Sequence, residues 1–349
     1  ATPRPSPTPA PTPVLEGDAA ATGPARDRLH LVGTQLTDAD GDRALLYGAT
    51  LYLLPFYLTD GWLDSTLMVE TRRITEQLDS MLDRMAELGM DTIRVPLGTP
   101  AWEQWLYPLT KDEWLQRLDL VVRGAEERDM KVVITWWDSL DLGAEWPARH
   151  DESFKFMRVV HDRYADDPHV FYEPWNEPWG ITWEQWGDAT TSTVRFWREE
   201  LGYRGVLVLD TNEWSWGFDT VQADRVLELD RELLGEANIL FAIHRYANDN
   251  TCFCGAELQE WENNVGQYVT SYPLVVTELG NSNEGRTPQT QWVDEFASHL
   301  VQVHVPEGLN GVLPFLWAWE DLNTMTDYDG VTLTDFGQRV VDHLDPIAG

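Results

Sequence analysis

The feature that most constrains the fold is a repeated alternation of short apolar runs with longer amphipathic segments along most of the chain. Short apolar runs are typical of buried strands, and apolar residues at helical spacing are typical of helices that pack on a sheet. The clearest expected helix covers Thr71–Leu88 and is ended by Gly89. The other expected helices are Asp112–Arg128, Glu152–Tyr164, Thr182–Leu201, Glu257–Tyr268, Pro288–Val303 and Thr334–Leu344. The expected strands are Leu45–Leu51, Thr92–Leu97, Lys131–Trp136, Val170–Pro174, Gly205–Leu209, Asn238–His244, Pro273–Thr277 and Gly311–Leu316.

Eight strands that alternate with helices predict the α/β class and a (β/α)₈ TIM barrel. An N-terminal β-hairpin, made of His30–Leu36 and Leu45–Leu51, is expected to plug the N-terminal end of the barrel. The acidic run Asp38–Arg43 between them is interpreted as an Asp-Gly turn, because the later ligands of a calcium loop are missing. A doubly wound open sheet is the alternative fold, but no strand is followed by its glycine-rich phosphate loop.

The chain of 349 residues carries 25 basic and 59 acidic side chains, a formal net charge of −34. Such a charge repels phosphate backbones and anionic headgroups, which argues against nucleic acid and membrane as partners. No apolar run approaches the roughly 20 residues that cross a bilayer. Only 3 of the basic residues are lysines, and dense carboxylates with little lysine suggest a surface suited to salt or acid. We expect a monomer.

Residues 1–28 are expected to form a flexible Pro/Thr-rich spacer, and residues 29–349 the catalytic barrel. Spacers of this composition are typical of exported proteins, so a secreted chain is expected. Cys252 and Cys254 form an isolated Cys-x-Cys pair. A small strained disulfide and two free thiols are both open here, and metal binding is less favoured.

The active site of a (β/α)₈ barrel lies at the carboxyl ends of its strands, so the residues that end the predicted strands are the candidates. They include aromatic, carboxyl and histidine side chains on six different strands. These candidates are Arg94, Trp137, Asp138, Asn176, Glu177, Asp210, Glu213, Trp214, His244, Tyr246, Glu278, Trp317, Trp319 and Glu320.

This set resembles the catalytic rim of the glycoside hydrolase family 5 cellulases, a family of clan A barrel glycosidases. The resemblance runs from about Leu29 to the end of the chain, and its most specific parts are Asn-Glu-Pro at 176–178 and Thr-Glu at 277–278. His244-x-Tyr246, Arg94 in the run TIRVPL and the closing run LTDFGQ fit as well. The resemblance implies that Glu177 is the acid/base and Glu278 the nucleophile.

The chemistry of glycoside cleavage agrees, since it requires one carboxyl group to protonate the leaving oxygen and another to attack the anomeric carbon. Strands four and seven face each other across a closed barrel, so Glu177 and Glu278 can flank one bond. Arg94 and Tyr246 are expected to hold the ionised Glu278. Asn176 is expected to bind the neighbouring sugar hydroxyl. Two carboxylates and water suffice, so no cofactor and no metal are expected.

Four carboxylates at rim positions are rivals to this pair: Asp138, Asp210, Glu213 and Glu320. One departure from the family concerns the end of strand three, where a histidine is usual and Trp137 and Asp138 stand here. That histidine binds the sugar before the cut, so the departure leaves the identity of the sugar open.

Tryptophan placement favours a carbohydrate ligand, because indole faces stack on the flat C–H faces of pyranose rings. Of the 18 tryptophans, twelve follow predicted strands: Trp62, Trp102, Trp105, Trp136, Trp137, Trp146, Trp175, Trp179, Trp214, Trp216, Trp317 and Trp319. Trp317 and Trp319 are the candidates for the platform under the sugar at the cut. Four others are expected to pack helices onto the barrel: Trp114, Trp197, Trp261 and Trp292.

The sequence therefore predicts a retaining β-glycoside hydrolase that acts on a polysaccharide or oligosaccharide, with β-1,4-linked glucan as the expected substrate. Mannan, xyloglucan and other β-glucans are alternatives, as is transglycosylation by the same carboxylates. A non-catalytic carbohydrate-binding protein on this scaffold is the alternative from another class.

Overall fold

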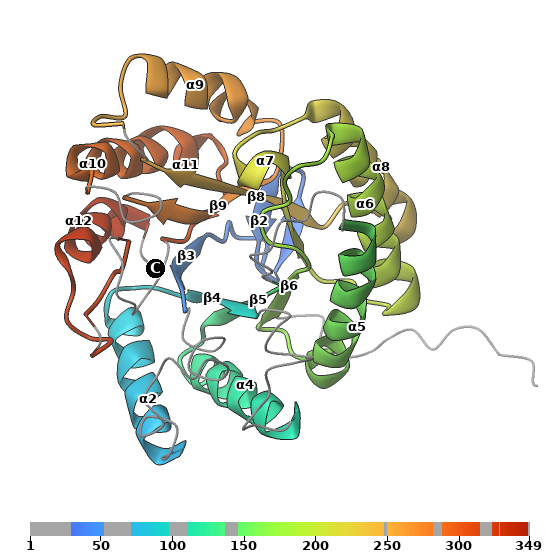
Figure 1. Ribbon diagram of the computed structural model, residues 1–349, viewed down its shortest axis with the longest axis horizontal. Coiled ribbons are helices and arrows are strands. Elements are labelled where there is room, and N and C mark those ends of the chain that lie inside the picture. The colour runs from blue at the N-terminus through green and yellow to red at the C-terminus, as the bar shows by residue number, and fades with distance from the viewer. Residues whose placement is uncertain are drawn as a thin grey trace, which may run out of the picture.

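The computed structural model describes residues 29–51, 71–97, 111–136, 146–247, 250–281, 288–314, 323–327 and 329–347. Within these ranges eight parallel strands close into a barrel in the order β10-β3-β4-β5-β6-β7-β8-β9, and helices surround it (Figure 1). The predicted (β/α)₈ class is confirmed. The barrel strands are β3 (Leu46–Thr50), β4 (Thr92–Leu97), β5 (Lys131–Trp136), β6 (Val170–Glu173), β7 (Leu207–Asp210), β8 (Ile239–Tyr246), β9 (Leu274–Gly280) and β10 (Gly311–Val312).

The helices of the described ranges follow the strands in chain order. They are α2 (Thr71–Glu87), α4 (Lys111–Glu126), α5 (Trp146–Tyr164), α6 (Trp183–Arg195), α7 (Asn212–Ser215), α8 (Thr220–Leu234), α9 (Ala256–Asn264), α10 (Thr290–His299), α11 (Val305–Glu307) and α12 (Asp335–Leu344), with short 3₁₀ turns η2 (Gly266–Tyr268) and η4 (Asp345–Ile347). The α-helices α6 and α10 are shorter than the predicted helices Thr182–Leu201 and Pro288–Val303. Each passes at its C-terminal end into a π-helical turn, η1 (Phe196–Glu200) and η3 (Leu300–His304).

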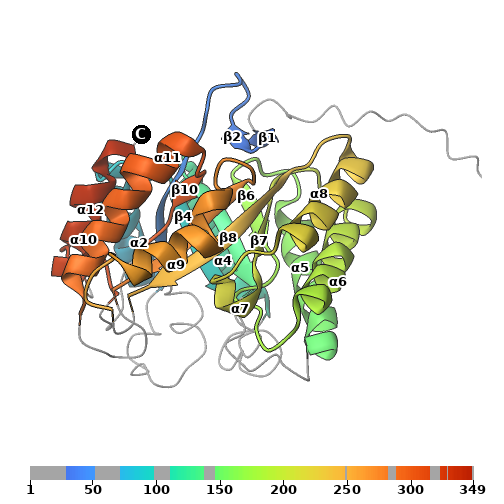
Figure 2. The same cartoon turned by 90° about the horizontal axis from the view of Figure 1, so that it is seen from above.

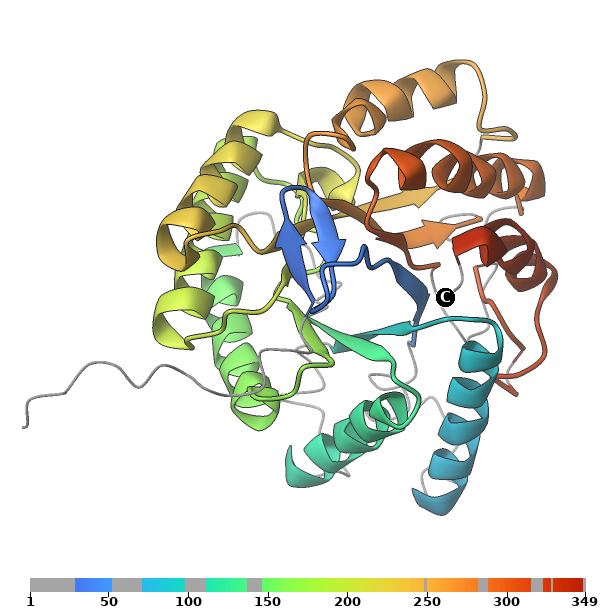
Figure 3. The same cartoon turned by 180° about the vertical axis from the view of Figure 1, so that it is seen from behind.

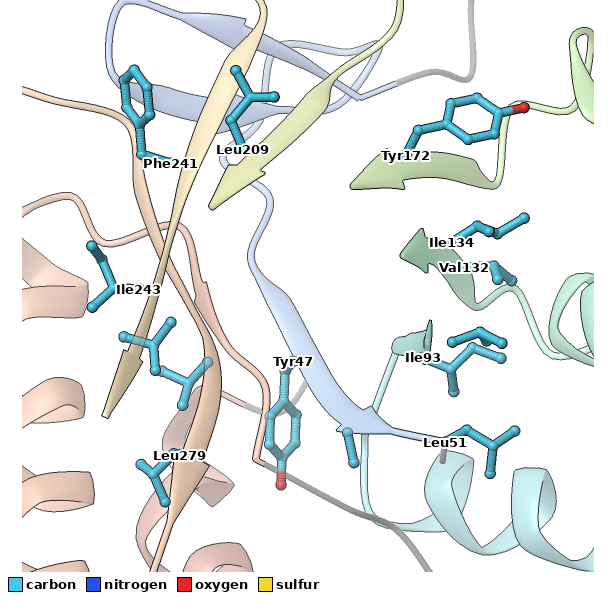
Figure 4. Close-up of a cluster of buried hydrophobic side chains, with 14 of the residues drawn as sticks. Tyr47, Leu51, Ile93, Val132, Ile134, Tyr172, Leu209, Phe241, Ile243 and Leu279 are labelled. Carbon is cyan, nitrogen blue, oxygen red and sulfur yellow. The ribbon is translucent and has the colours of Figure 1, made fainter. Parts of the chain in front are cut away.

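The barrel strands are buried on both faces, which explains why they are nearly continuous apolar runs. One set of side chains points away from the barrel axis toward the helices, as Figure 4 shows for Ile134, Tyr172 and Ile243. Trp197, Trp261 and Trp292 lie fully buried in this layer, so their predicted packing role is confirmed. The side chain of Trp114 lies outside the described residues.

The N-terminal hairpin is present, but its second strand is not the predicted one. The antiparallel pair is β1 (His30–Val32) with β2 (Gln35–Thr37), joined by a turn at Gly33 with φ +67°. Leu46–Thr50, predicted both for the hairpin and as the first of the eight strands, belongs only to the barrel, where it pairs in parallel with β4 and β10. A strand buried on both faces gains more as a central barrel strand than in a two-stranded hairpin, which leaves one face in water.

The hairpin closes one end of the barrel. Its Leu31 and Leu36 are buried in a cluster with interior side chains of the barrel such as Val133 and Leu240. The backbone N–H groups of the same two leucines donate to Asn238 Oδ1 and Asn310 Oδ1 at 3.1 and 2.7 Å. Figures 2 and 3 show β1 and β2 across this end, opposite α7. Functional side chains are therefore sought at the other end.

The acidic run after β2 forms a turn, as predicted. Asp38 Oδ1 accepts hydrogen bonds from the backbone N–H groups of Asp40 and Asp42 at 3.0 and 2.9 Å. An antiparallel bridge between Thr37 and Arg43 closes the turn.

Cys252 and Cys254 form a disulfide, so the expectation of two free thiols is wrong and that of a local disulfide is confirmed. None of the helices in the described ranges combines the length and the apolar character needed to cross a lipid bilayer.

Candidate active site

Polar side chains from several barrel strands meet at the carboxyl ends of the strands. His244 on β8 lies between the two carboxylates singled out in the sequence, with Nδ1 2.7 Å from Glu177 Oε1 and 3.5 Å from Glu278 Oε2. One oxygen of Glu177 and one of Glu278 lie within 4.8 Å of each other. The structure thus brings together two glutamates that are far apart in the chain.

The end of β9 positions Glu278 through an irregularity in the sheet. β8 and β9 extend beyond the predicted strands six and seven. Tyr246 and Glu278, expected after those strands, therefore lie inside them, as does His244, which was expected to end strand six. His244 pairs with Glu278, whereas its predecessor Ile243 pairs with Val276, so Thr277 is an extra residue in β9. A bulge of this kind redirects side chains. Here Thr277 Oγ1 contacts His244 Nε2 at 3.0 Å, while Glu278 contacts other donors.

Both oxygens of the Glu278 carboxylate accept hydrogen bonds. Arg94 Nη1 donates to Oε1 and the Tyr246 hydroxyl donates to Oε2, each at 2.5 Å. Burial raises the pKa of Glu278, while the Arg94 charge and the Tyr246 hydrogen bond oppose that rise by stabilising the anion. Glu278 is therefore surrounded by groups that bind its ionised form.

Arg94 is anchored by a carboxylate that the sequence analysis missed. Glu173, the last residue of β6, accepts from Arg94 Nε at 2.7 Å and from Nη2 at 2.8 Å, and both side chains are fully buried. Although burial opposes it, Arg94 lowers the pKa of Glu173 to about 2. A charged residue inside the apolar run VFYE was the available signal. The two hydrogen bonds to Glu173 fix the orientation of the guanidinium, so that Arg94 Nη1 faces Glu278.

Asn176 and Glu177 follow β6. Asn176 is buried, and its Oδ1 accepts from Arg94 Nη2 at 2.5 Å, which fixes the orientation of the amide. Glu177 has φ +46°, a left-handed conformation that a non-glycine residue rarely adopts. Its backbone N–H donates to Asp210 Oδ2 at 2.7 Å. Asp210, a rival carboxylate in the sequence analysis, thus holds the backbone of Glu177 in place.

Asp210 is a further buried carboxyl group whose pKa responds to Glu173. Its Oδ2 accepts from Glu177 N and from Ser215 Oγ, whereas its buried Oδ1 has no hydrogen-bond donor among the described residues. Burial and the neighbouring Glu173 raise the pKa of Asp210 well above its usual range. A protonated Oδ1 that donates to Glu173 accounts for both observations.

Glu177 and His244 have strongly shifted pKa values. Burial raises the pKa of Glu177 to about 7, with the Arg94 charge opposing and the Glu173 charge assisting the rise. Burial lowers the pKa of His244 to about 4, so the imidazole is neutral near pH 7. The Glu177 side chain is 25% exposed, which leaves its carboxyl group reachable from solvent. The site therefore holds a carboxyl group that keeps a proton near neutral pH.

The segment after β7 carries an exposed aromatic surface. Trp214 is 48% exposed and stacks on Trp179, with ring centroids 4.6 Å apart and planes 14° apart. Its backbone N–H donates to Pro178 O at 3.2 Å, which ties this segment to the loop of Glu177. Glu213, another rival carboxylate, is exposed on this segment.

Other tryptophans expected at the rim have different surroundings. Trp136 is buried against Phe156, and Trp216 lies under the guanidinium of Arg245 at 4.6 Å. Trp175, which follows β6, has a half-buried side chain. The other predicted residues lie outside the described residues or have side chains that do. They are Trp62, Trp102, Trp105, Trp137, Asp138, Trp146, Trp317, Trp319 and Glu320.

Two solved structures share the fold of this chain at low sequence identity. The catalytic domain of a mannanase from Streptomyces sp. SirexAA-E superimposes with a TM-score of 0.67 at 18% identity, covering 98% of this chain and 96% of that one. The catalytic domain of an endoglucanase from Thermobifida fusca gives a TM-score of 0.65 at 19% identity, covering 91% and 97%.

Sequence comparison places the chain in a family. Endoglucanase Z of Dickeya dadantii is 24% identical over 232 residues, which cover 64% of this chain and 48% of the relative. The chain spans about half the length of the curated relatives that it matches. The profile of the family described as cellulase, glycosyl hydrolase family 5, matches residues 64–321. Since this match covers well over half of the chain, the protein belongs to glycosyl hydrolase family 5.

Proposed function

We propose that the protein is a retaining β-glycanase in which Glu177 is the acid/base and Glu278 the nucleophile. The observation that carries this proposal is the distance between the two carboxyl groups, whose nearest oxygens lie within 4.8 Å. Retaining enzymes hold their carboxyl groups about 5–5.5 Å apart, whereas inverting enzymes need about 6.5–9.5 Å to admit a water molecule.

The proposed reaction has two steps. In the first, Glu278 attacks the anomeric carbon, the glycosidic C–O bond breaks, and the Glu177 proton passes to the departing oxygen. In the second, water attacks the glycosyl ester, its proton passes to Glu177, and the Glu278 carboxylate leaves. A Glu177 pKa of about 7 suits both roles, because the group must lose and regain one proton per turnover.

The neighbours of the pair have separate roles in this proposal. Arg94 and Tyr246 keep Glu278 ionised by donating to both of its oxygens. Neutral His244 contacts Glu177 and positions its carboxyl group. Asn176 presents its amide nitrogen to the sugar hydroxyl, since its oxygen is engaged by Arg94.

The stacked indoles of Trp179 and Trp214 are proposed to bind a sugar ring next to the scissile bond. Trp214 offers an exposed face, while its stacking on Trp179 fixes the orientation of the ring. Trp137, Asp138, Trp317 and Trp319 remain predictions from the sequence for further sugar contacts.

The proposed substrate is a β-1,4-linked glucan, because four of the relatives matched along the sequence are endoglucanases, whereas one is a mannan endo-1,4-beta-mannosidase. A mannan is the second candidate, favoured by the match to a mannanase structure. We further propose a secreted monomer with residues 1–28 as a spacer, supported by the Pro/Thr-rich composition and by a disulfide, a bond typical of oxidising compartments.

The test measures reducing ends released from soluble cellulose derivatives, mannan and xyloglucan by the wild type, Glu177→Gln, Glu278→Gln and the exposed control Glu200→Gln. We expect at least about a 10³-fold loss in kcat for the first two variants and none for the control. Near-normal turnover by either variant would contradict the assignment. If the wild type binds a glycan tightly but releases no reducing ends, the protein is a carbohydrate-binding protein. Products longer than the oligosaccharide supplied would indicate transglycosylation.

A further inference from the structure

Away from the barrel mouth, three side chains converge between the outer helices. They are Glu262 on α9, His299 at the end of α10 and His304 at the end of η3. His299 Nε2 lies 2.7 Å from Glu262 Oε1 and 3.1 Å from His304 Nε2. His304 Nε2 lies 3.2 Å from the same glutamate oxygen. Three potential ligand atoms thus form a small triangle.

The π-helical turn creates this arrangement. In a regular α-helix, residues five apart point about 140° away from each other, so His299 and His304 would lie on different faces. The turn Leu300–His304 adds a residue to the helical repeat and brings the two rings to a centroid distance of 4.7 Å. Single π-helical turns occur frequently at functional sites.

Hydrogen bonding fixes the tautomer of His304. The Trp261 indole N–H, which can only donate, lies 2.9 Å from His304 Nε2, and the Glu307 carboxylate lies 3.2 Å from Nδ1. The neutral ring therefore carries its proton on Nδ1 and a lone pair on Nε2. That lone pair, to which Trp261 donates, and Glu262 Oε1 are two acceptors 3.2 Å apart. His299 Nε2 lies near both, so either its N–H or a bound cation can bridge the two acceptors.

We propose that Glu262, His299 and His304 bind a divalent transition metal of the zinc class. Ligand atoms around tetrahedral zinc lie about 3.3 Å apart when the bonds are about 2.0–2.1 Å, close to the 2.7–3.2 Å found here. Two imidazoles favour zinc over calcium or magnesium, which prefer oxygen ligands. Glu307 on Nδ1 supplies the carboxylate partner that metal-bound histidines usually have.

The metal would replace the Trp261 N–H as the partner of His304 Nε2 and leave a fourth position for water. It would join α9, which follows β8, to η3, which leads toward β10, and so stabilise the outer layer around the strands that carry His244 and Glu278. This site is independent of the proposed glycanase reaction.

The test uses the full chain without a polyhistidine tag, freed of metal with a chelator. Calorimetry with Zn²⁺ is expected to give one site per chain, and Zn²⁺ is expected to raise the melting temperature. Bound Co²⁺ is expected to show the visible absorption of a four-coordinate ion. His299→Gln and Glu262→Gln, both at partly exposed positions, are expected to weaken binding at least about tenfold.

His343→Gln is the matched control, because His343 pairs with Asp294 on another helix face and takes no part in the cluster. It is expected to bind Zn²⁺ like the wild type. Circular dichroism establishes that the variants are folded. The absence of a stoichiometric site, or equal affinity in the wild type, His299→Gln and Glu262→Gln, would overturn the proposal. The carboxylates at the barrel mouth are intact in every variant. If Zn²⁺ bound there, all variants would bind it with equal affinity, and this would also overturn the proposal.

Discussion

The two carboxyl groups that flank His244 have different surroundings. Glu278 receives hydrogen bonds from Arg94 and Tyr246, which favour its anion. Glu177 has no direct hydrogen bond from a cationic side chain among the described residues, and burial raises its pKa to about 7. These contacts support the proposed roles of Glu177 as acid/base and Glu278 as nucleophile.

The Glu177 pKa predicts the alkaline limb of the pH profile. The proposed mechanism requires protonated Glu177. Its protonated fraction falls as pH rises through about 7, so kcat/KM should decline above that pH. A pH series of initial rates on a neutral β-glycan measures this limb. The residual activity of Glu177→Gln should not show this decline at alkaline pH. A profile that stays flat to pH 9 in the wild type would contradict the assigned pKa.

Glu173 is predicted to be a stability residue that acts through Arg94. Glu173→Gln breaks a fully buried ion pair and should lower the free energy of unfolding by about 3–5 kcal/mol. The control Glu200→Gln removes an exposed pair with Arg158 and should change it by less than about 1 kcal/mol. Urea unfolding at neutral pH measures both, and equal values for the two variants would contradict the account.

The pH dependence of that loss has a definite sign. The Glu173 pKa is lowered from 4.5 to about 2, so its stabilising effect is complete above pH 4.5 and disappears as pH falls toward 2. The difference between the wild type and Glu173→Gln should shrink over this range.

Residues that belong to a short sequence motif are easier to predict from the sequence than the residues that hold them in place. Asn-Glu-Pro and Thr-Glu identify Glu177 and Glu278 because both motifs are local. Glu173 was missed since it lies in an apolar run and its partner Arg94 is 79 residues away in the chain. Its role depends on burial beside that partner, which only the closed barrel creates.

At the scale of elements, the segment after β7 has an unusual backbone. Glu213, Trp214 and Ser215 are three consecutive residues with φ between +57° and +62°. Left-handed conformations of non-glycine residues are costly and are retained where surrounding contacts fix them. Here Ser215 Oγ donates to Asp210 and Trp214 N donates to Pro178 O, so the segment supports the loop of Glu177.

Replacing a glutamate by glycine at two positions tests the left-handed backbone of this segment. Glu213→Gly relieves the left-handed strain and should raise the free energy of unfolding by about 0.5–1 kcal/mol. Glu228→Gly, at an exposed position inside α8, should lower it by about 1 kcal/mol. Thermal or chemical unfolding gives both values. If glycine destabilised the protein equally at positions 213 and 228, the backbone of Glu213 would not be strained.

Most elements were predictable from apolar periodicity, whereas the helix α8 and three local details were not. The hairpin turn falls at Gly33, and the stronger Asp-Gly signal at Asp40–Gly41 forms the following turn instead. The π-helical turns after α6 and α10 keep the helical pattern of apolar residues, so they look like α-helix in a sequence. The left-handed run at Glu213 contains no glycine that would signal it.

At the scale of the whole molecule, the net charge of −34 predicts the response to salt. Like charges on the surface destabilise the compact state, and salt screens them, since the Debye length falls from about 30 Å at 0.01 M to about 3 Å at 1 M. The melting temperature should therefore rise with sodium chloride over this range. A steady fall in melting temperature with added salt would contradict the account.

The closely spaced Glu177 and Glu278 are proposed to cleave a β-glycoside through a covalent intermediate with retention of configuration. Proton NMR of the first-formed sugar, recorded during hydrolysis before mutarotation, tests this most directly. Retention predicts that the new reducing end appears first as the β-anomer. First appearance of the α-anomer would mean a single displacement by water and would contradict it.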